Sequence, residues 1–150
     1  MDELHQIDEG VPPGQQTALV PSDSAPTSEA LLAAGATSCA VALAMAASVA
    51  AHRDSCGKCT FGREGTRQLT IVLGDLIAGK GSASDIDLLL DLCDTMHDGS
   101  LCEKGRNIAD AVLAMVRHYR ADFDAHANKA PCSMQQVGDI ASASAAERPR

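Results

Sequence analysis

The chain has 150 residues, a formal net charge of −8, and only one Tyr and two Phe as aromatic residues. An acidic chain with so few stacking side chains is a poor candidate for nucleic-acid binding, and its length predicts one domain. The first residues lack the basic and apolar regions of a secretion signal. Six cysteines without such a signal indicate a reducing, cytoplasmic setting, where clustered cysteines point to metal or redox chemistry.

Proline occurs only near the two ends of the chain, and none lies between residues 30 and 130. Because proline interrupts helices, this central stretch can be almost entirely helical. The two ends are rich in small and polar residues that bury little apolar surface. We therefore expect disordered tails at residues 1–28 and 128–150, and a helical domain at 29–127.

The first expected helix runs from about Glu29 to Arg53 and is rich in alanine, a strong helix former. Residues 30–51 carry no charge and are numerous enough to cross a bilayer. Half of them are alanine, however, and several others are polar, so that insertion into lipid gains little. We expect a packed helix here and no membrane span.

Three further helices follow in the sequence, from about Gly65 to Ala78, from Ser84 onward, and from about Arg106 to His126. Their apolar residues recur every three or four positions, which is typical of helices with one buried face. Alternation of the kind found in strands is nearly absent. The sequence therefore predicts an all-α fold, a four-helix bundle with short connections.

Three cysteines fall in two of the expected loops. Cys56 and Cys59 lie between the first and second helices, and Cys102 lies between the third and fourth. In a bundle whose helices alternate in direction, these two loops share one end. Thiolates are soft, charged ligands that suit iron–sulfur clusters. We therefore interpret Cys56, Cys59 and Cys102 as candidate metal ligands.

Basic residues surround the first of these loops: Arg53, Lys58, Arg63 and Arg67. They either offset the negative charge of thiolates and a cluster or form an ordinary solvated face. We interpret Cys39 as a small core residue inside the first helix. Cys93 is either a core residue or a substitute ligand, and Cys132 is expected to be a free thiol in the C-terminal tail.

One segment carries a family resemblance. Residues 55–66 read S-C-G-K-C-T-F-G-R-E-G-T and resemble the signature S-C-G-K-C-T-P-C-R-E-G-T. This signature belongs to the iron–sulfur binding region of the flavoprotein (F) component of NADH:quinone oxidoreductase (complex I). The diaphorase subunits of NAD-linked formate dehydrogenases and hydrogenases share it. Residues 100–105 and 117–123 also resemble the family, so that the resemblance covers about 36–127.

The resemblance implies a four-helix domain that holds a [4Fe–4S] cluster and passes on electrons from FMN reduced by NADH. Its ligands here would be Cys56, Cys59 and Cys102, with Gly62 at the position of the family's remaining cysteine. Phe61 and Ala111 stand where the family has prolines. The implied partners are a flavin- and NADH-binding subunit and further iron–sulfur subunits of an oxidoreductase complex.

No glycine-rich nucleotide loop precedes Cys56. We therefore expect no catalytic residues in this chain and no oxidation of NADH by the chain alone.

Gly62 leaves three interpretations open. A cluster could rest on three cysteines, with the fourth iron bound by water, a thiol, Asp54 or His97, or lost to leave a three-iron cluster. Alternatively, the cluster is gone and the chain is an interaction or regulatory subunit that keeps the fold. In the third interpretation, three thiolates and a histidine hold a structural zinc ion.

Overall fold

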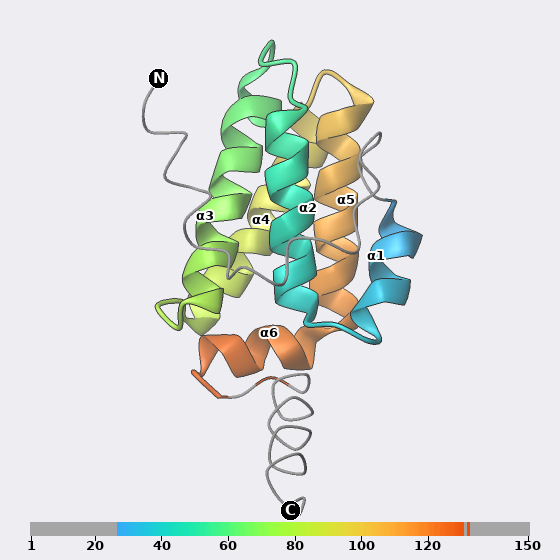
Figure 1. The fold of residues 1–150 in the computed structure, drawn as a ribbon. Helices are drawn as coiled ribbons and strands as arrows, with labels where there is room; N and C mark the ends of the chain where they lie inside the picture. Colours follow the sequence, from blue (N-terminus) through green and yellow to red (C-terminus); the bar gives the residue numbers. More distant parts are fainter. Residues whose placement is uncertain (1–26, 131, 133–150) are drawn as a thin grey trace, which may run out of the picture.

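The structure, a computed structural model, describes residues 27–130 and residue 132. Over these residues the chain is helical without any strand (Figure 1), which confirms the prediction of an all-α fold. Most of the two expected tails, residues 1–26, 131 and 133–150, lies outside the described residues. The elements in chain order are α1 (Ser28–Gly35), α2 (Ala40–Arg53), the π-helix η3 (Phe61–Gly65), α3 (Thr66–Ile77), α4 (Ala83–Gly99), α5 (Glu103–His118) and α6 (Arg120–Ala127).

The four longer helices, α2 to α5, run alongside one another. Helix α2 packs against α3 and α5, and α4 packs against α5 and α3. The short helix α1 lies against α5, and α6 runs across one end of the other helices (Figure 1). The short loops alternate between the two ends, so that the α2–η3 and α4–α5 loops are at the end away from α6.

Two of the expected helices are each divided in the structure. The helix expected over Glu29–Arg53 breaks at residues 36–39, where α1 turns back to pack on α5. The ring of Tyr119 lies over Gly35, where an added Cβ would be 2.5 Å from it, and its hydroxyl donates a hydrogen bond to the carbonyl of Leu32. Tyr119 also separates α5 from α6. The contact between Tyr119 and α1 therefore lies beside both helix breaks.

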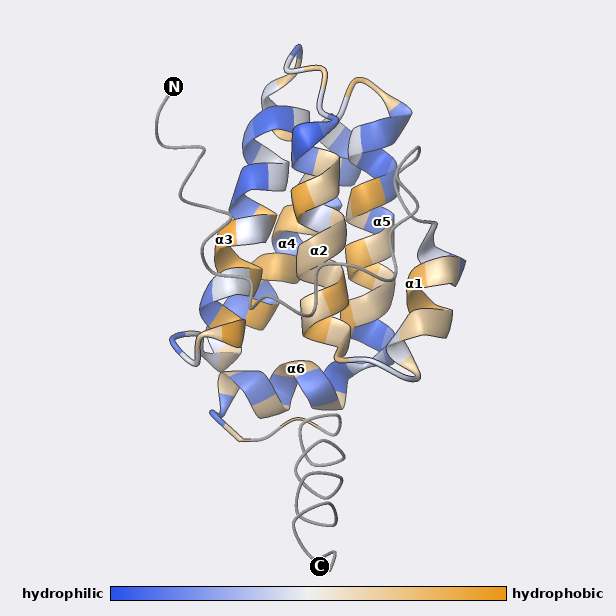
Figure 2. Ribbon diagram, viewed as in Figure 1, coloured by the Kyte–Doolittle hydropathy of each residue, from blue (hydrophilic) through white to orange (hydrophobic). Residues whose placement is uncertain are grey.

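The core is formed by the inner faces of all six α-helices. Figure 2 shows the hydrophobic residues along the middle of the bundle, whereas the end that carries the α2–η3 loop is mainly hydrophilic. Leu69, Leu73 and Leu76 on α3 are fully buried, as their spacing predicted. The ring of Phe123 on α6 is buried too and closes the core at the opposite end. None of the helices in the described part of the chain is both long and apolar enough to cross a membrane.

Candidate metal centre

Two loops meet at the end of the bundle that lies away from α6 (Figure 1). The structure brings all three candidate ligands, Cys56, Cys59 and Cys102, to one pocket between these loops. The other residues that line the pocket are Ala51, Ser55, Gly62, Thr66, Lys104 and Gly105. Side chains that are 43 to 46 residues apart in the sequence therefore face the same space.

Glycines allow the two loops to approach closely. Gly57 has a positive φ of 68°, a backbone conformation that glycine adopts at low cost, and it turns the chain between the two cysteines. Gly105, in the first turn of α5, lies against Ser100 and Gly62. A Cβ at this position would be 2.4 Å from the Ser100 hydroxyl oxygen and 3.7 Å from the Cα of Gly62. Only a residue without a side chain fits at that point.

Position 62 faces the pocket from η3, a π-helical turn of a kind that often occurs at functional sites. A Cβ built on Gly62 would lie 3.1 Å from the sulfur of Cys59 and 3.9 Å from the hydroxyl oxygen of Ser55. A Cβ at this position would thus point at the Cys59 sulfur, at a distance short enough that the sulfur would have to shift slightly.

The sulfur of Cys59 is placed among hydrogen-bond donors. The backbone N–H of Gly62 donates to it at 3.3 Å. Hydrogen bonds from the backbone of Leu101, on the other loop, and of Gly62 lower the pKa of the Cys59 thiol, and the positive charge of Arg63 adds to this effect. The guanidinium of Arg63 also donates to the carbonyl oxygen of Gly57 at 3.1 Å. This environment favours the thiolate, which is the form that binds metals.

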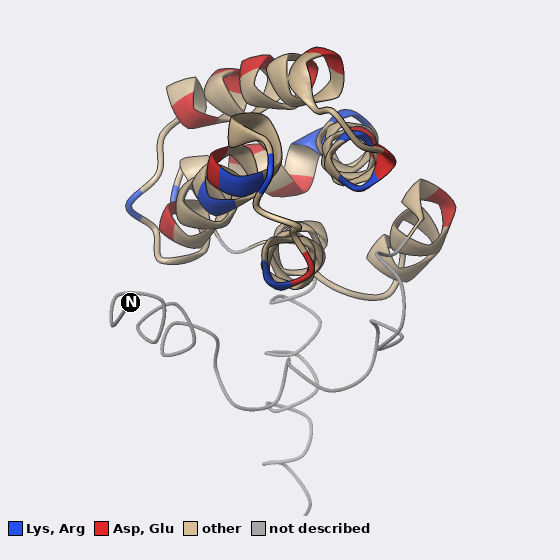
Figure 3. Ribbon diagram, turned by 90° about the horizontal axis from the view of Figure 1, so that it is seen from above, with Lys and Arg blue, Asp and Glu red and all other residues tan. Residues whose placement is uncertain are grey.

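The basic residues around this end of the bundle differ in whether they reach the pocket. Of the four that the sequence singled out, Arg63 acts on Cys59, but none lines the pocket. Lys104, which sequence reasoning did not single out, lines the pocket two residues after Cys102. Figure 3 looks down on this end and shows basic residues near the loops, while α4 carries five aspartates and no Lys or Arg.

The three sulfurs at this pocket are not as close together as the ligands of a single zinc ion would be. Four ligands at about 2.3 Å from one zinc ion place their sulfurs about 3.8 Å apart. Cys56, Cys59 and Cys102 do not form a set whose ligand atoms all lie within 4.8 Å of one another.

Other residues considered as substitute ligands do not reach the pocket. Asp54 and His97 are not among its lining residues. Nδ1 of His97 lies 2.8 Å from a carboxylate oxygen of Asp110 on the exposed surface. Cys93 is 1% exposed within the core and also does not line the pocket. The core interpretation of Cys93 therefore agrees with its position.

The cysteines are expected to differ sharply in reactivity. Burial raises the pKa of the Cys93 thiol to about 12, whereas the side chain of Cys56 is exposed. In reduced, metal-free protein at about pH 8, iodoacetamide should modify Cys56 well before Cys93, because attack requires an accessible thiolate. Peptide mapping by mass spectrometry measures the two rates. Equal rates in the folded protein would contradict the position of Cys93, and equal rates in denaturant provide the control.

The site is thus a pocket lined by three cysteines between two loops of an all-α domain, with backbone donors and a lysine around it. The sequence model for the NADH-ubiquinone oxidoreductase-F iron-sulfur binding region matches residues 40–126. The chain belongs to this family.

Several curated proteins resemble this region of the chain. The F subunit of NADH-quinone oxidoreductase in Streptomyces coelicolor is 38% identical over 79 residues, which are 53% of this chain and 18% of that protein. The NADP-reducing hydrogenase subunit HndC of Solidesulfovibrio fructosivorans is 30% identical over 53% of this chain and 16% of its own length. The NADP(+)-dependent formate dehydrogenase subunit beta of Moorella thermoacetica is 43% identical over 47% of this chain and 10% of its own length. The chain therefore spans less than a fifth of these relatives.

Proposed function

We propose that this chain is an iron–sulfur electron-transfer module of an NAD-linked oxidoreductase complex, with Cys56, Cys59 and Cys102 as the ligands of its cluster. The observation that carries the proposal is the pocket itself, to which two separate loops contribute these three cysteines. Membership of the iron–sulfur binding family supports it. A bound cluster would supply one-electron transfer.

The residues around the pocket suit such a group. The backbone N–H groups that lower the pKa of Cys59 would also donate to its sulfur when it is a ligand. Lys104 on the wall of the pocket and Arg63 beside it would offset the negative charge of thiolates and cluster. Hydrogen bonds and nearby charge are among the features through which a protein sets the potential of a cluster.

Gly62 distinguishes this centre from one with four cysteine ligands. We propose that the iron at the cluster corner facing Gly62 is bound by water or a small thiol instead of a protein thiolate. Alternatively, the cluster has only three irons. Ser55 is the polar side chain nearest that corner, since its hydroxyl oxygen lies 3.9 Å from the position of a Cβ at residue 62. A centre with an open corner should be more labile than a fully ligated one.

The partners follow from the relatives, which are subunits of NADH-quinone oxidoreductase, of a hydrogenase and of a formate dehydrogenase. We propose that a flavin- and NADH-binding subunit donates electrons to this module and that further iron–sulfur subunits accept them. Electron transfer requires close approach to the pocket. We place the contact at the loop end, where Leu101 beside Cys102 is 78% exposed.

Anaerobic purification and reconstitution test the cluster directly. We expect about three to four irons per chain, an equal amount of sulfide, and an EPR signal on reduction. The double variant Cys56→Ser/Cys59→Ser should lose this iron. The variant Cys93→Ala, which removes a cysteine outside the pocket, should keep it. Colourless protein without iron after anaerobic reconstitution would rule out the proposed module.

A cluster-free interaction subunit is the second candidate, and one observation favours it. The main hydrophobic cluster of the bundle contains none of Cys56, Cys59 and Cys102, so the helices can pack without any metal. In this case Cys56→Ser/Cys59→Ser leaves both partner binding and partner activity unchanged. Loss of partner activity with binding intact would favour the electron-transfer function.

A further inference from the structure

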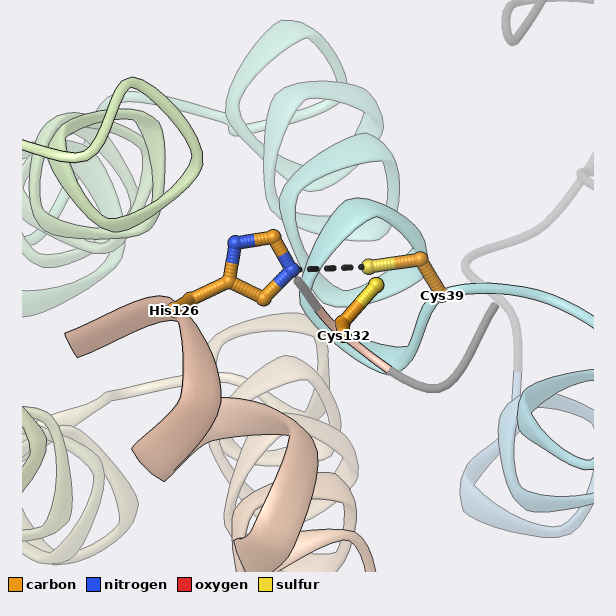
Figure 4. Close-up of side chains that lie close together, drawn as sticks. All are labelled: Cys39, His126 and Cys132. Atoms are coloured by element: carbon orange, nitrogen blue, oxygen red, sulfur yellow. Dashed lines mark hydrogen bonds between the residues drawn. The ribbon is translucent and has the colours of Figure 1, made fainter. Parts of the chain in front are cut away.

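A second group of metal-ligating side chains lies at the other end of the bundle. Cys39, His126 and Cys132 offer one donor atom each, and these three atoms all lie within 4.8 Å of one another (Figure 4). The sulfur of Cys39 is 3.3 Å from Nε2 of His126. Among the described residues, no other set of three Cys, His, Asp or Glu side chains meets this distance.

The three donors come from separate segments of the chain. Cys39 immediately precedes α2, His126 is in the last turn of α6, and Cys132 follows α6. Cys132 is 1% exposed, and the other two side chains are partly buried. The expectation that Cys39 lies within a helix is therefore wrong, because Cys39 is the N-cap residue that precedes α2. Cys132 is a free thiol beyond the last helix, as the sequence predicted, but it is buried rather than exposed.

The imidazole of His126 has the orientation of a metal ligand. Nε2 faces Cys39. Burial lowers the pKa of the ring, and the charge of Asp122 and a hydrogen bond with the backbone of Leu76 only partly oppose this effect. The other ring nitrogen of His126 points away from the two sulfurs (Figure 4), so it is open to a partner such as a backbone carbonyl. Histidine ligands usually donate their second ring nitrogen to such a partner.

We propose that Cys39, His126 and Cys132 bind a zinc ion, separate from the centre at the loop end, with water or another small ligand in the fourth position. Two sulfurs and an imidazole nitrogen are ligands that zinc prefers, and their spacing needs only small movements to surround one ion. Zinc would displace the protons of both thiols, which leaves a neutral dithiolate–zinc unit without any change of oxidation state.

The ion would fasten three segments that no disulfide bond links. It would connect the beginning of α2, the end of α6 and the residue beyond α6, and so hold α6 across the bundle. The two sulfurs alone could instead form a disulfide. A disulfide would not involve the imidazole nitrogen that lies 3.3 Å from the Cys39 sulfur. The donor set therefore favours a metal ion over oxidation.

The test uses the full chain with Cys56, Cys59 and Cys102 replaced by serine, so that the loop-end pocket cannot bind the metal. After purification under reductant and addition of Zn²⁺, we expect one tightly bound zinc per chain. Co²⁺ in its place should give the intense thiolate-to-metal absorption of a tetrahedral site. Introducing Cys39→Ser or His126→Asn into this background should abolish both signals. Introducing Cys93→Ala, which removes a buried cysteine elsewhere, should preserve them.

Thermal unfolding gives a second measurement, because a metal that binds only the folded state raises Tm. Zn²⁺ should raise Tm of the triple-serine protein but not of its Cys39→Ser derivative. The proposal is overturned if the triple-serine protein binds no zinc, if Cys39→Ser and His126→Asn retain it, or if mass spectrometry shows a Cys39–Cys132 disulfide under reductant. These outcomes are independent of whether the loop-end pocket holds a cluster.

Discussion

The variant Gly62→Cys will keep its iron–sulfur cluster in air about tenfold longer than the native chain, or longer still. Even an outer-shell partner is typically worth about 10–100-fold in metal affinity, and a direct thiolate should be worth at least as much. The backbone at residue 62 needs no positive φ, so a cysteine adopts it without backbone strain, although the Cys59 sulfur must shift by a few tenths of an ångström. Its Cβ would project toward Cys59, into the pocket.

The measurement is the decay of the cluster's visible absorption in air, together with iron content after anaerobic reconstitution. Gly62→Ala is the matched control, because it adds the same Cβ without a sulfur. That Cβ would lie 3.1 Å from the Cys59 sulfur, so the alanine variant reports any cost of crowding by itself. If cysteine and alanine at residue 62 give the same occupancy and lifetime, position 62 does not face the metal centre.

The helices with a strict apolar repeat were predictable from the sequence. Leu69, Val72, Leu73 and Leu76 recur at helical spacing, and all four are buried. The breaks at residues 36–39 and at Tyr119 were not predictable in the same way. Alanine favours helix on both sides of the first break, and a contact between the Tyr119 ring and Gly35, 84 residues apart in the sequence, lies beside it.

The candidate site was predictable at the level of topology but not of detail. The order of helices and loops was sufficient to place Cys56, Cys59 and Cys102 at one end. The backbone donor at Leu101 and the position of Lys104 depend on loop conformations that no repeat in the sequence encodes. The group at the α6 end has no recognisable spacing, because Cys39 is 87 residues from His126. Only the packing of α6 against the bundle brings its members together.

Replacing Phe123 with alanine is expected to lower the free energy of unfolding by about 3–5 kcal/mol, the typical cost of removing a buried phenylalanine ring. Phe123 is 0% exposed and is the largest of the fully buried side chains in the described residues. It lies on α6, which packs against α2, α3, α4 and α5, so its loss opens a cavity where α6 meets the core. In a domain of about 100 residues, this corresponds to a decrease in Tm of roughly 12 °C or more.

Urea denaturation followed by circular dichroism measures this loss, and Leu88→Ala is a suitable control. Leu88 is 49% exposed on α4, and surface substitutions usually change stability by about 0.5 kcal/mol or less. A loss of under about 1 kcal/mol for Phe123→Ala would mean that its ring is not buried as the structure places it. Both variants leave Cys56, Cys59 and Cys102 in place. The stability of the bundle can therefore be measured without changing the ligands of the candidate cluster, which separates folding from metal binding at the loop-end pocket.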